Sequence, residues 1–504
     1  MLAKVFSASV TGVEAESVEV EVNAGFGDSG IIVVVGLPDA AVKESKDRVT
    51  TAMINSGFRT HQGRTTVNLA PADVRKEGPS FDLPIALGML LATEQIKTPP
   101  LDGFFIVGEL ALDGGIRPVQ GVLSIALKAR ELGLKGVIVP SDNAREAAVV
   151  DGIEVYPVRN LREAAEFLSG EEPIARATED VDALFAFDGQ YEADFSDVKG
   201  QESVKRALEI AAAGGHNILM IGPPGTGKSM LAKRLPSILP PMTLDEALET
   251  TKIHSVAGLL KPGESIVTIR PFRSSHHTIS DIGLVGGSSN LRPGEVSLAH
   301  NGVLFLDELP EFKRQTLEIL RQPLEDGKVS ISRATGSVTF PCKFMLVAAM
   351  NPSPSGVKSE NLAAQKRYLD RISRPLLDRF DIHCEVPAVK YADLAGKAPG
   401  ENSAAIRARV VTARGRQKAR FHGTKTHCNA HMSSRQLREV CKLREDVEEL
   451  LKMAMNELNF SARAHDRILK VARTIADLED SDDIGAHHIS EAIQYRTLDR
   501  TLWQ

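Results

Sequence analysis

The sequence predicts an α/β fold that is divided between several domains and ends in a group of helices. A chain of 504 residues is too long for one hydrophobic core, so we expect two to four domains. Short apolar runs alternate with helical patterns in the middle of the chain, as in a parallel sheet covered by helices. From about Ala404 the pattern is helical throughout, and residues 443–458 and 463–478 repeat apolar side chains at helical spacing.

The composition is that of an ordinary globular protein, with 42% hydrophobic and 25% charged residues. The net charge of −6 gives no general attraction to nucleic acids or acidic membranes, so a polyanion site would have to be a local patch. No apolar run approaches the roughly 20 residues that span a bilayer, and the N-terminus lacks the pattern of a signal peptide. The four cysteines form no C-x-x-C pair, which fits a reducing cytoplasm. We therefore expect a cytoplasmic protein without a membrane partner.

The first part of the chain mixes strands and helices. Residues 17–22 alternate as a strand does, 31–35 form a continuous β-branched run, and 40–56 have a helical pattern. Further strands are expected at 104–107 and 137–139, with a helix at 123–132 between them. These elements predict an α+β domain over residues 1–170.

An acidic segment follows that domain. Between Glu171 and Asp197 there are nine acidic residues and one basic residue, Arg176, without clear periodicity. We expect residues 171–196 to be a partly flexible linker.

The phosphate-loop pattern G-x-x-x-x-G-K-[ST] occurs without a mismatch just after the linker. An apolar run at 217–221 precedes it and a helix-forming run at 230–235 follows it, as the motif requires. Its glycines allow successive N–H groups to point at a polyphosphate. Lys228 would then reach the β- and γ-phosphates, and the Ser229 hydroxyl would hold Mg²⁺. The residues expected to bind the nucleotide are Gly222, Pro223, Pro224, Gly225, Thr226, Gly227, Lys228 and Ser229.

Polar residues follow two later strands. Asp307 and Glu308 come directly after the apolar run 303–306, and Asn351 follows the run 344–350. In open α/β sheets ligands bind at the carboxyl ends of the strands. Asp307 is expected to complete the Mg²⁺ shell, and Glu308 to orient and deprotonate the attacking water. Asn351 is expected to contact that water or the γ-phosphate.

This order of motifs resembles that of the AAA+ ATPases. The segment 376–381 is similar to their arginine-finger segment, so Arg379 would enter the site of a neighbouring subunit. Arg463 opens the last long helix, as their second sensor arginine does, and would act in its own subunit. The resemblance implies an AAA+ core at residues 197–400, a helical lid at 401–504, Mg-ATP as the cofactor and a homo-hexameric ring.

Two insertions narrow the resemblance. Residues 253–301 form a long segment after the phosphate loop, and 327–340 alternate on both sides of an Ala-Thr-Gly turn, as a β-hairpin does. Both insertions are similar to those of MCM helicases and magnesium-chelatase motor subunits, in which they project toward the pore. Lys328 and Arg333 would then contact a phosphate backbone. The alternative is a structural hairpin with solvated charges.

The tract 273–309 resembles the magnesium-chelatase-like ComM/YifB family most closely. It contains the adjacent residues His276 and His277. Neighbouring side chains diverge on a strand or a helix, so two such histidines make a poor metal site. We expect them to be ring or pore contacts.

The N-terminal domain resembles the proteolytic domain of Lon, whose fold is that of ribosomal protein S5 domain 2. The similar segments are 108–119, 136–140 and Gly78-Pro79-Ser80, which places Ser80 at the nucleophile. A Ser-Lys dyad also needs a lysine as the base, and Leu123 stands where Lon carries it. We therefore expect a domain without catalytic activity, and an ATP-dependent protease is the least favoured class.

No zinc is expected. Relatives in the ComM family carry a cysteine cluster after the sensor asparagine, where this chain has Ser353-Pro354-Ser355-Gly356. A second candidate, formed by His427, Cys428 and His431, has poor ligand spacing and no fourth ligand.

The most basic part of the chain is residues 407–438, which hold nine basic residues and no acidic ones. Three interpretations stay open: a contact with DNA, a contact with an acidic neighbour in the ring, or a solvated helix face.

The family resemblance implies a hexameric, helicase-like DNA motor that is driven by ATP and migrates branched recombination intermediates, for example during natural transformation. The competing class is a protein-remodelling ATPase of the magnesium-chelatase type.

Overall fold

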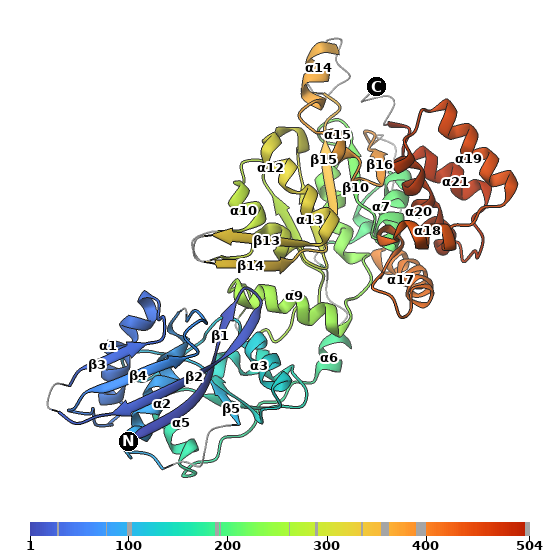
Figure 1. The fold of residues 1–504 in the computed structure, drawn as a ribbon. Helices are drawn as coiled ribbons and strands as arrows, with labels where there is room; N and C mark the ends of the chain where they lie inside the picture. The colour runs from blue at the N-terminus through green and yellow to red at the C-terminus, as the bar shows by residue number, and fades with distance from the viewer. Residues whose placement is uncertain are drawn as a thin grey trace. The chain divides into compact units, whose positions relative to one another are not determined.

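The computed structural model describes residues 1–27, 30–76, 78–97, 103–186, 191, 193–261, 263–287, 291–333, 336–353, 362–389 and 400–498. The chain forms two compact units (Figure 1). One unit contains residues 1–188 together with 244–268, and the other contains 189–243 and 269–504. Among the described residues, no helix combines the length and the apolar character needed to cross a bilayer.

The first sheet of the N-terminal unit has the strand order β1-β2-β4-β3. The predicted alternating strand lies in β2 (Glu14–Ala24), which pairs antiparallel with β1 (Leu2–Thr11) and β4 (Thr65–Ala70). The β-branched run forms the parallel edge strand β3 (Ile32–Val35). Helix α1 (Ala40–Asn55) starts where Asp39 accepts a hydrogen bond from the N–H of Val42, and α2 (Asp82–Ala92) is buried along nearly its whole length.

The second sheet of this unit is parallel, with the order β5-β8-β9. Its strands are β5 (Phe104–Ile106), β8 (Gly136–Pro140) and β9 (Glu154–Val158). Helices α3 (Val122–Glu131), α4 (Ala144–Ala148) and α5 (Leu161–Leu168) belong to the same body, as does a short ribbon of β6 (Glu109–Leu110) and β7 (Ile116–Arg117). The segment 244–268 begins with α9 (Leu244–Val256) and is part of this unit, although it lies within the range 197–400 expected for the core and its insertions.

The second unit is built on a parallel sheet in the order β11-β12-β15-β10-β16. These strands span Phe272–Ser275, Val303–Leu306, Met345–Met350, Ile218–Ile221 and Ile382–Glu385, in that order. Helices α7 (Glu202–Gly214) and α8 (Lys228–Arg234) flank β10 in the chain. The predicted alternation of strands and helices around a parallel sheet is confirmed.

Short elements extend the second unit beyond its sheet. The predicted hairpin consists of β13 (Lys328–Arg333) and β14 (Gly336–Pro341), with Val329 and Ile331 buried. The same unit contains the short helices α10 (Asp281–Val285), α11 (Glu295–Leu298), α12 (Arg314–Ile319) and α13 (Arg321–Asp326), of which α13 contacts β13. Two more short helices of this unit, α14 (Leu362–Leu369) and α15 (Arg374–Leu377), precede β16. The predicted linker contains α6 (Val181–Ala186), which belongs to the N-terminal unit.

The C-terminal part is helical, as predicted. It contains α17 (Ser403–Arg420), α18 (Ser434–Val440), α19 (Glu445–Glu457), α20 (Ala462–Leu478) and α21 (Ala486–Gln494), drawn in orange and red in Figure 1. Ser461 caps α20 by accepting a hydrogen bond from the N–H of Ala464. The apolar face of α20 packs against α7, α17 and α21, so the helices share one hydrophobic core with the sheet.

Candidate nucleotide-binding site

The predicted nucleotide residues converge at one edge of the parallel sheet. The phosphate loop follows β10, Asp307 and Glu308 follow β12, and Asn351 follows β15, which lies between those two strands. The carboxyl ends of parallel strands share an edge, so three segments far apart in the sequence meet there.

The phosphate loop has the backbone that its glycines permit. Gly225 and Gly227 have φ values of +78° and +86°, a left-handed region that favours glycine. The space beside Gly225 is open, because no heavy atom lies within 4 Å of where its Cβ would be. The Thr226 hydroxyl donates to the Pro223 carbonyl at 3.0 Å and holds the turn closed.

Lys228 is buried at the centre of the site. Its Nζ donates to the carbonyls of Gly222 (2.6 Å) and Pro223 (2.9 Å) and to Oδ1 of Asn351 (3.1 Å). Burial lowers the pKa of Lys228, while Asp307 and Glu308 act to raise it. In the described part of the chain this ammonium forms no direct ion pair, and a buried cation that no carboxylate contacts fits a polyphosphate group.

Ser229 and Asp307 form the oxygen ligand set that Mg²⁺ prefers. The Ser229 hydroxyl donates to Oδ2 of Asp307 at 2.6 Å, and Oδ1 of Asp307 accepts a hydrogen bond from the N–H of Glu308 at 3.0 Å. Hydroxyl and carboxylate oxygens suit a hard cation such as Mg²⁺. Both residues expected to hold the metal are therefore in contact.

Glu308 lies next to a histidine whose position the sequence did not reveal. Its Oε2 is 3.4 Å from Nδ1 of His277, and its side chain is 56% exposed. The His277 ring also meets Phe312 edge-on and lies 4.1 Å, centroid to centroid, from the ring of His276. His276 instead contacts the Thr278 hydroxyl at 2.9 Å. One of the two expected ring or pore contacts thus lies against the candidate base.

Gln201 is a second residue that sequence reasoning missed. Its Nε2 donates to the carbonyls of Thr226 (2.8 Å) and Pro387 (3.1 Å), so it ties the start of α7 to the phosphate loop. A positive φ of 59° at Gln201 sets this geometry. A glutamine before a helix carries no sequence signal of such a role.

Arg379 lies at the opposite edge of the sheet from the phosphate loop. It stands three residues before β16, which runs parallel to β10, and its carbonyl accepts a hydrogen bond from Nδ2 of Asn217 at 2.9 Å. Asn217 directly precedes β10, whereas the loop follows it. The guanidinium pairs with Glu325, and burial together with Arg467 lowers the pKa of Arg379.

Arg463 lines the same pocket as Arg379 and, among the described residues, forms its ion pair away from the phosphate loop. Its Nη1 is 3.1 Å from Oδ2 of Asp378. Both arginines line a pocket of about 290 Å³ between sheet and helices, together with Arg467 and Lys470. The structure thus joins the two predicted arginines in one pocket, whose lining also includes Glu325, Asp381 and Asp466. In the described part of the chain, no contact supports a role for Arg463 at its own phosphate loop.

The two candidate DNA contacts of the hairpin do not form a patch. Lys328 pairs with Pro341 at the base of the hairpin, whereas Arg333 pairs with Gly336 next to the turn. Nε of Arg333 donates to the carbonyl of Gly287 at 3.1 Å. Arg333 therefore anchors the hairpin to a neighbouring segment, as the structural interpretation of the hairpin expects.

Acidic residues of the same unit neutralise part of the basic tract 407–438. Arg409 pairs with Glu209 and Glu401, and Arg416 pairs with Asp480 and Asp482. Two further pairs are Arg420 with the buried Asp477 and Arg435 with Glu439. Four of the nine basic residues are thus ion-paired within the chain, which favours a structural role for this part of the tract.

The sequence offers two candidate segments for zinc. In the first, residues 354–361 lie outside the described part of the chain. Cys428 is 3.3 Å from Nδ1 of His431, and this histidine, against the effect of burial, lowers the pKa of Cys428 to about 5. The structure adds no third ligand to that pair among the described residues.

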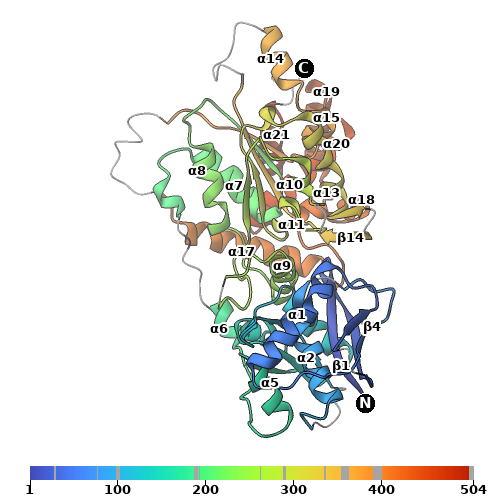
Figure 2. The same ribbon diagram turned by 90° about the vertical axis from the view of Figure 1, so that its left-hand side faces the viewer.

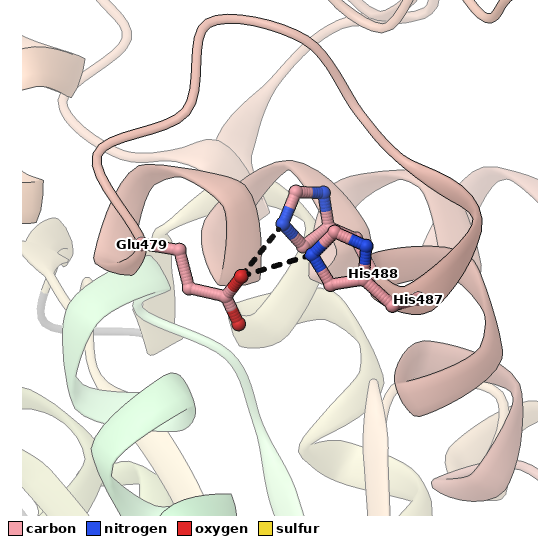
Figure 3. Close-up of side chains that lie close together, drawn as sticks. All are labelled: Glu479, His487 and His488. Atoms are coloured by element: carbon pink, nitrogen blue, oxygen red, sulfur yellow. Dashed lines mark hydrogen bonds and ion pairs between the residues drawn. The ribbon is translucent and has the colours of Figure 1, made fainter.

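A different group, Glu479, His487 and His488, brings three possible ligand atoms together (Figure 3). Both Nε2 atoms lie 3.0 Å from Oε2 of Glu479. The N–H of Gly485 donates to Nδ1 of His488 at 2.8 Å, so in the neutral ring the hydrogen is on Nε2, which then donates to Glu479. A metal bound at Nε2 would move the ring hydrogen to Nδ1, which could then no longer accept the hydrogen bond from Gly485 that caps α21. We therefore assign the group a structural role at the junction of α20 and α21.

In the N-terminal unit, the Lon-like positions carry no dyad. Ser80 lies in a short turn of 3-10 helix, and its carbonyl accepts a hydrogen bond from the N–H of Gly108 at 3.0 Å. Leu123 is fully buried in the first turn of α3. An apolar side chain there cannot take a proton from a serine hydroxyl.

Comparisons with known proteins agree with this architecture. Family models described as magnesium chelatase subunit ChlI match residues 194–394 and 18–143, and the model of the C-terminal part of that subunit matches 400–496. The chain is 45% identical to YifB of Escherichia coli (strain K12) over 99% of its length and 98% of that protein. It is also 45% identical to competence protein ComM of Haemophilus influenzae, with the same coverage.

A more distant relative is the magnesium-chelatase subunit ChlI of Mesostigma viride, which is 27% identical over 42% of this chain and 60% of that protein. The full-length matches and the three family models cover both units. The chain therefore belongs to the magnesium-chelatase-like family of AAA+ ATPases that includes the YifB and ComM proteins.

Proposed function

We propose that this protein is a Mg-ATP-hydrolysing ring motor that acts on DNA and migrates branched recombination intermediates. The observation that carries the ATPase part is the convergence of Lys228, Ser229, Asp307 and Asn351 within hydrogen-bonding distance at one sheet edge. The DNA part is supported by the relative named as a competence protein, because competence concerns DNA uptake.

In the proposed reaction the loop N–H groups and Lys228 hold the β- and γ-phosphates, and Ser229 with Asp307 holds the metal. Bound Mg²⁺ would supply neutralisation of the phosphate oxygens. Glu308 orients and deprotonates the attacking water, and Asn351 fixes the water or the γ-phosphate. His277 holds the Glu308 carboxylate in place.

Arg379 and Arg463 act on the nucleotide of the neighbouring subunit. Both belong to the sheet edge opposite their own phosphate loop, so their charges serve a nucleotide only across a subunit boundary. A ring of subunits, six in the proposed assembly, supplies this boundary at every site. In this proposal Arg463 also acts in the neighbour's site, in contrast to the role expected from the sequence.

The experiment compares ATP hydrolysis alone and with single-stranded, duplex and branched DNA over a range of salt concentrations. A DNA motor is expected to hydrolyse faster with branched DNA, and the stimulation should fall steeply with salt, because phosphate contacts release counterions. DNA binding without any effect on hydrolysis, at any salt concentration, would contradict the motor.

A protein remodeller is the second candidate. It is favoured by the net charge of −6 and by the ion pairs that neutralise part of the basic tract, since both reduce the positive charge left for DNA. The matched ChlI family supports the same class. Stimulation of hydrolysis by a protein partner, with none by DNA, would establish it.

A further inference from the structure

The N-terminal unit contains a helix from the middle of the chain. Figures 1 and 2 both show α9 against the blue N-terminal body, and the division into units assigns all of segment 244–268 to it. Leu248 of α9 packs against the hydrophobic core that contains Leu123 and Val122 of α3. The segment thus completes the core of the N-terminal body.

A buried polar contact fixes α9 to α3. The Ser255 hydroxyl donates to Oε1 of Glu146 at 2.5 Å and accepts a hydrogen bond from the N–H of Gly121 at 2.9 Å. Glu146, only 5% exposed, also accepts from the N–H of Leu123 (2.9 Å) and from Nδ2 of Asn143 (3.1 Å). Removing one of these partners would leave a buried carboxylate oxygen of Glu146 without a hydrogen bond, which costs free energy. The contact between Ser255 and Glu146 is therefore expected to hold α9 firmly in this position.

Two further contacts hold the rest of the segment. Nη1 of Arg145 donates to the Gly263 carbonyl at 2.9 Å, and Nζ of Lys252 lies 3.6 Å from Oε1 of Glu14. The buried contact lies beside Leu123, the position at which the Lon-like base is absent. The segment therefore occupies the surface of the N-terminal body at the start of α3, next to Leu123.

Both ends of the segment lead directly to the candidate nucleotide site. Before it, the chain comes from α8, whose first residues are Lys228 and Ser229. After it, the chain enters β11, and His277, which contacts Glu308, follows that strand closely. A shift of α8 or of the end of β11 on nucleotide exchange would pull on the segment from either side.

We propose that segment 244–268 couples the nucleotide site to the N-terminal body, which is thereby a part that the ATPase moves. The inference rests on the proposed ATPase function. The N-terminal body would respond to the nucleotide state through Ser255 and Glu146, and the surface at the start of α3 would be the attachment point of the segment.

Hydrogen exchange of the full-length protein, measured with ADP and with a non-hydrolysable ATP analogue, tests the coupling. Peptides covering α9 and the first turn of α3 should exchange at different rates in the two nucleotide states. In Ser255→Ala, exchange in α9 should be at least about tenfold faster, because the buried carboxylate loses a charge-assisted bond. The nucleotide response of α3 should then disappear.

Ser124→Ala is the matched control. Its hydroxyl is equally buried and lies on α3, but it donates to the Val13 carbonyl at 2.7 Å and does not contact the segment. This variant should keep the nucleotide response. Arg145→Ala removes the bond to the Gly263 carbonyl and the ion pair with Glu179 but leaves the buried contact intact, so it should weaken the response even if Ser255→Ala fails to fold.

Binding of a fluorescent ATP analogue to the same samples separates this inference from the proposed function. If the analogue binds and the exchange of α3 and α9 is the same in both nucleotide states, the coupling is refuted and the ATPase proposal stands. If Ser255→Ala and Arg145→Ala both keep the full difference in exchange between the two nucleotide states, the proposal that the segment acts through these contacts is refuted. If no nucleotide binds, both proposals fail.

Discussion

Arg379 gives the sharpest test of the proposed reaction, because its place in the sheet decides whose nucleotide it can serve. Asn217, which bonds to the Arg379 carbonyl, precedes β10, and Gly222 follows it. Strand residues rise about 3.3 Å each, so the two ends of this stretch are about 16 Å apart along the sheet. An arginine side chain does not span that distance and still contact the γ-phosphate.

The expected loss follows from the charge that Arg379 supplies. A positioned guanidinium in trans is worth about 10³–10⁵ in rate, and Arg379→Ala should lower kcat by that order with ATP affinity nearly unchanged. Lys228→Ala should remove nucleotide binding at its own site and leave its arginine intact. Each variant alone is expected to be inactive.

Rings assembled from equal amounts of the two variants decide the question. A site is complete when an Arg379→Ala subunit supplies the loop and a Lys228→Ala subunit supplies the arginine, which random assembly produces at about a quarter of the boundaries. Turnover should therefore return to about a quarter of the unmodified level. If the mixture stays inactive although mixed rings form, as native mass spectrometry would show, the trans assignment is refuted.

The same assay locates Arg463. Because Arg463 pairs with Asp378 next to Arg379, Arg463→Ala mixed with Lys228→Ala should also recover activity. A mixture of Arg463→Ala with Arg379→Ala should not, since every subunit then lacks one arginine at the same edge. Recovery in the second mixture and none in the first would place Arg463 at its own nucleotide.

Four further predictions concern single residues. Glu308→Gln should retain ATP binding and lower kcat by at least about 10²-fold, because the amide cannot take the proton; unchanged turnover in a steady-state assay would exclude Glu308 as the base. His277→Ala should lower kcat about tenfold with ATP affinity unchanged, because the half-exposed Glu308 loses its orienting partner, whereas His276→Ala should leave kcat as it is. Asp477→Ala leaves the buried Arg473 and the partly buried Arg420 without their carboxylate. It should lower the free energy of unfolding, measured by urea titration, by about 3–5 kcal/mol. The control is Arg435→Ala, which removes an exposed ion pair and should change this free energy little. Burial raises the pKa of Asp381, but Arg467 and His216 outweigh burial and hold this pKa below its ordinary value. The carboxylate therefore stabilises the fold fully above about pH 4, and this stabilisation declines as the pH falls toward the pKa in the folded protein. Asp381→Asn should flatten the acid limb of a curve of unfolding free energy against pH.

The parts of the site that local patterns specify could be predicted from the sequence. The glycine spacing of the phosphate loop and the polar residues after 303–306 and 344–350 are local, and the rule that parallel strands share an edge joins them. Helix limits were predicted closely where a cap marks the start, as for α1 after Asp39 and α20 after Ser461.

The rest depends on partners that are distant in the chain. The acidic residues that neutralise Arg409 and Arg416 include Glu209, Asp480 and Asp482, and no local pattern pairs them. The contact between His277 and Glu308 likewise depends on how the chain returns after β11. The attachment of α9 to the N-terminal body depends on Ser255, a common residue whose hydroxyl acquires its role only through the burial of Glu146.

The discontinuous make-up of the N-terminal body also sets the order in which it can be completed during translation. Its first 188 residues leave the ribosome well before segment 244–268, and at about 5–20 residues per second the gap of about 80 residues lasts roughly 4–16 seconds. For that interval Glu146 and the apolar side chains beside α3 lack their cover. The nascent chain is then a surface that chaperones would recognise, and a product truncated near residue 188 would keep it exposed permanently.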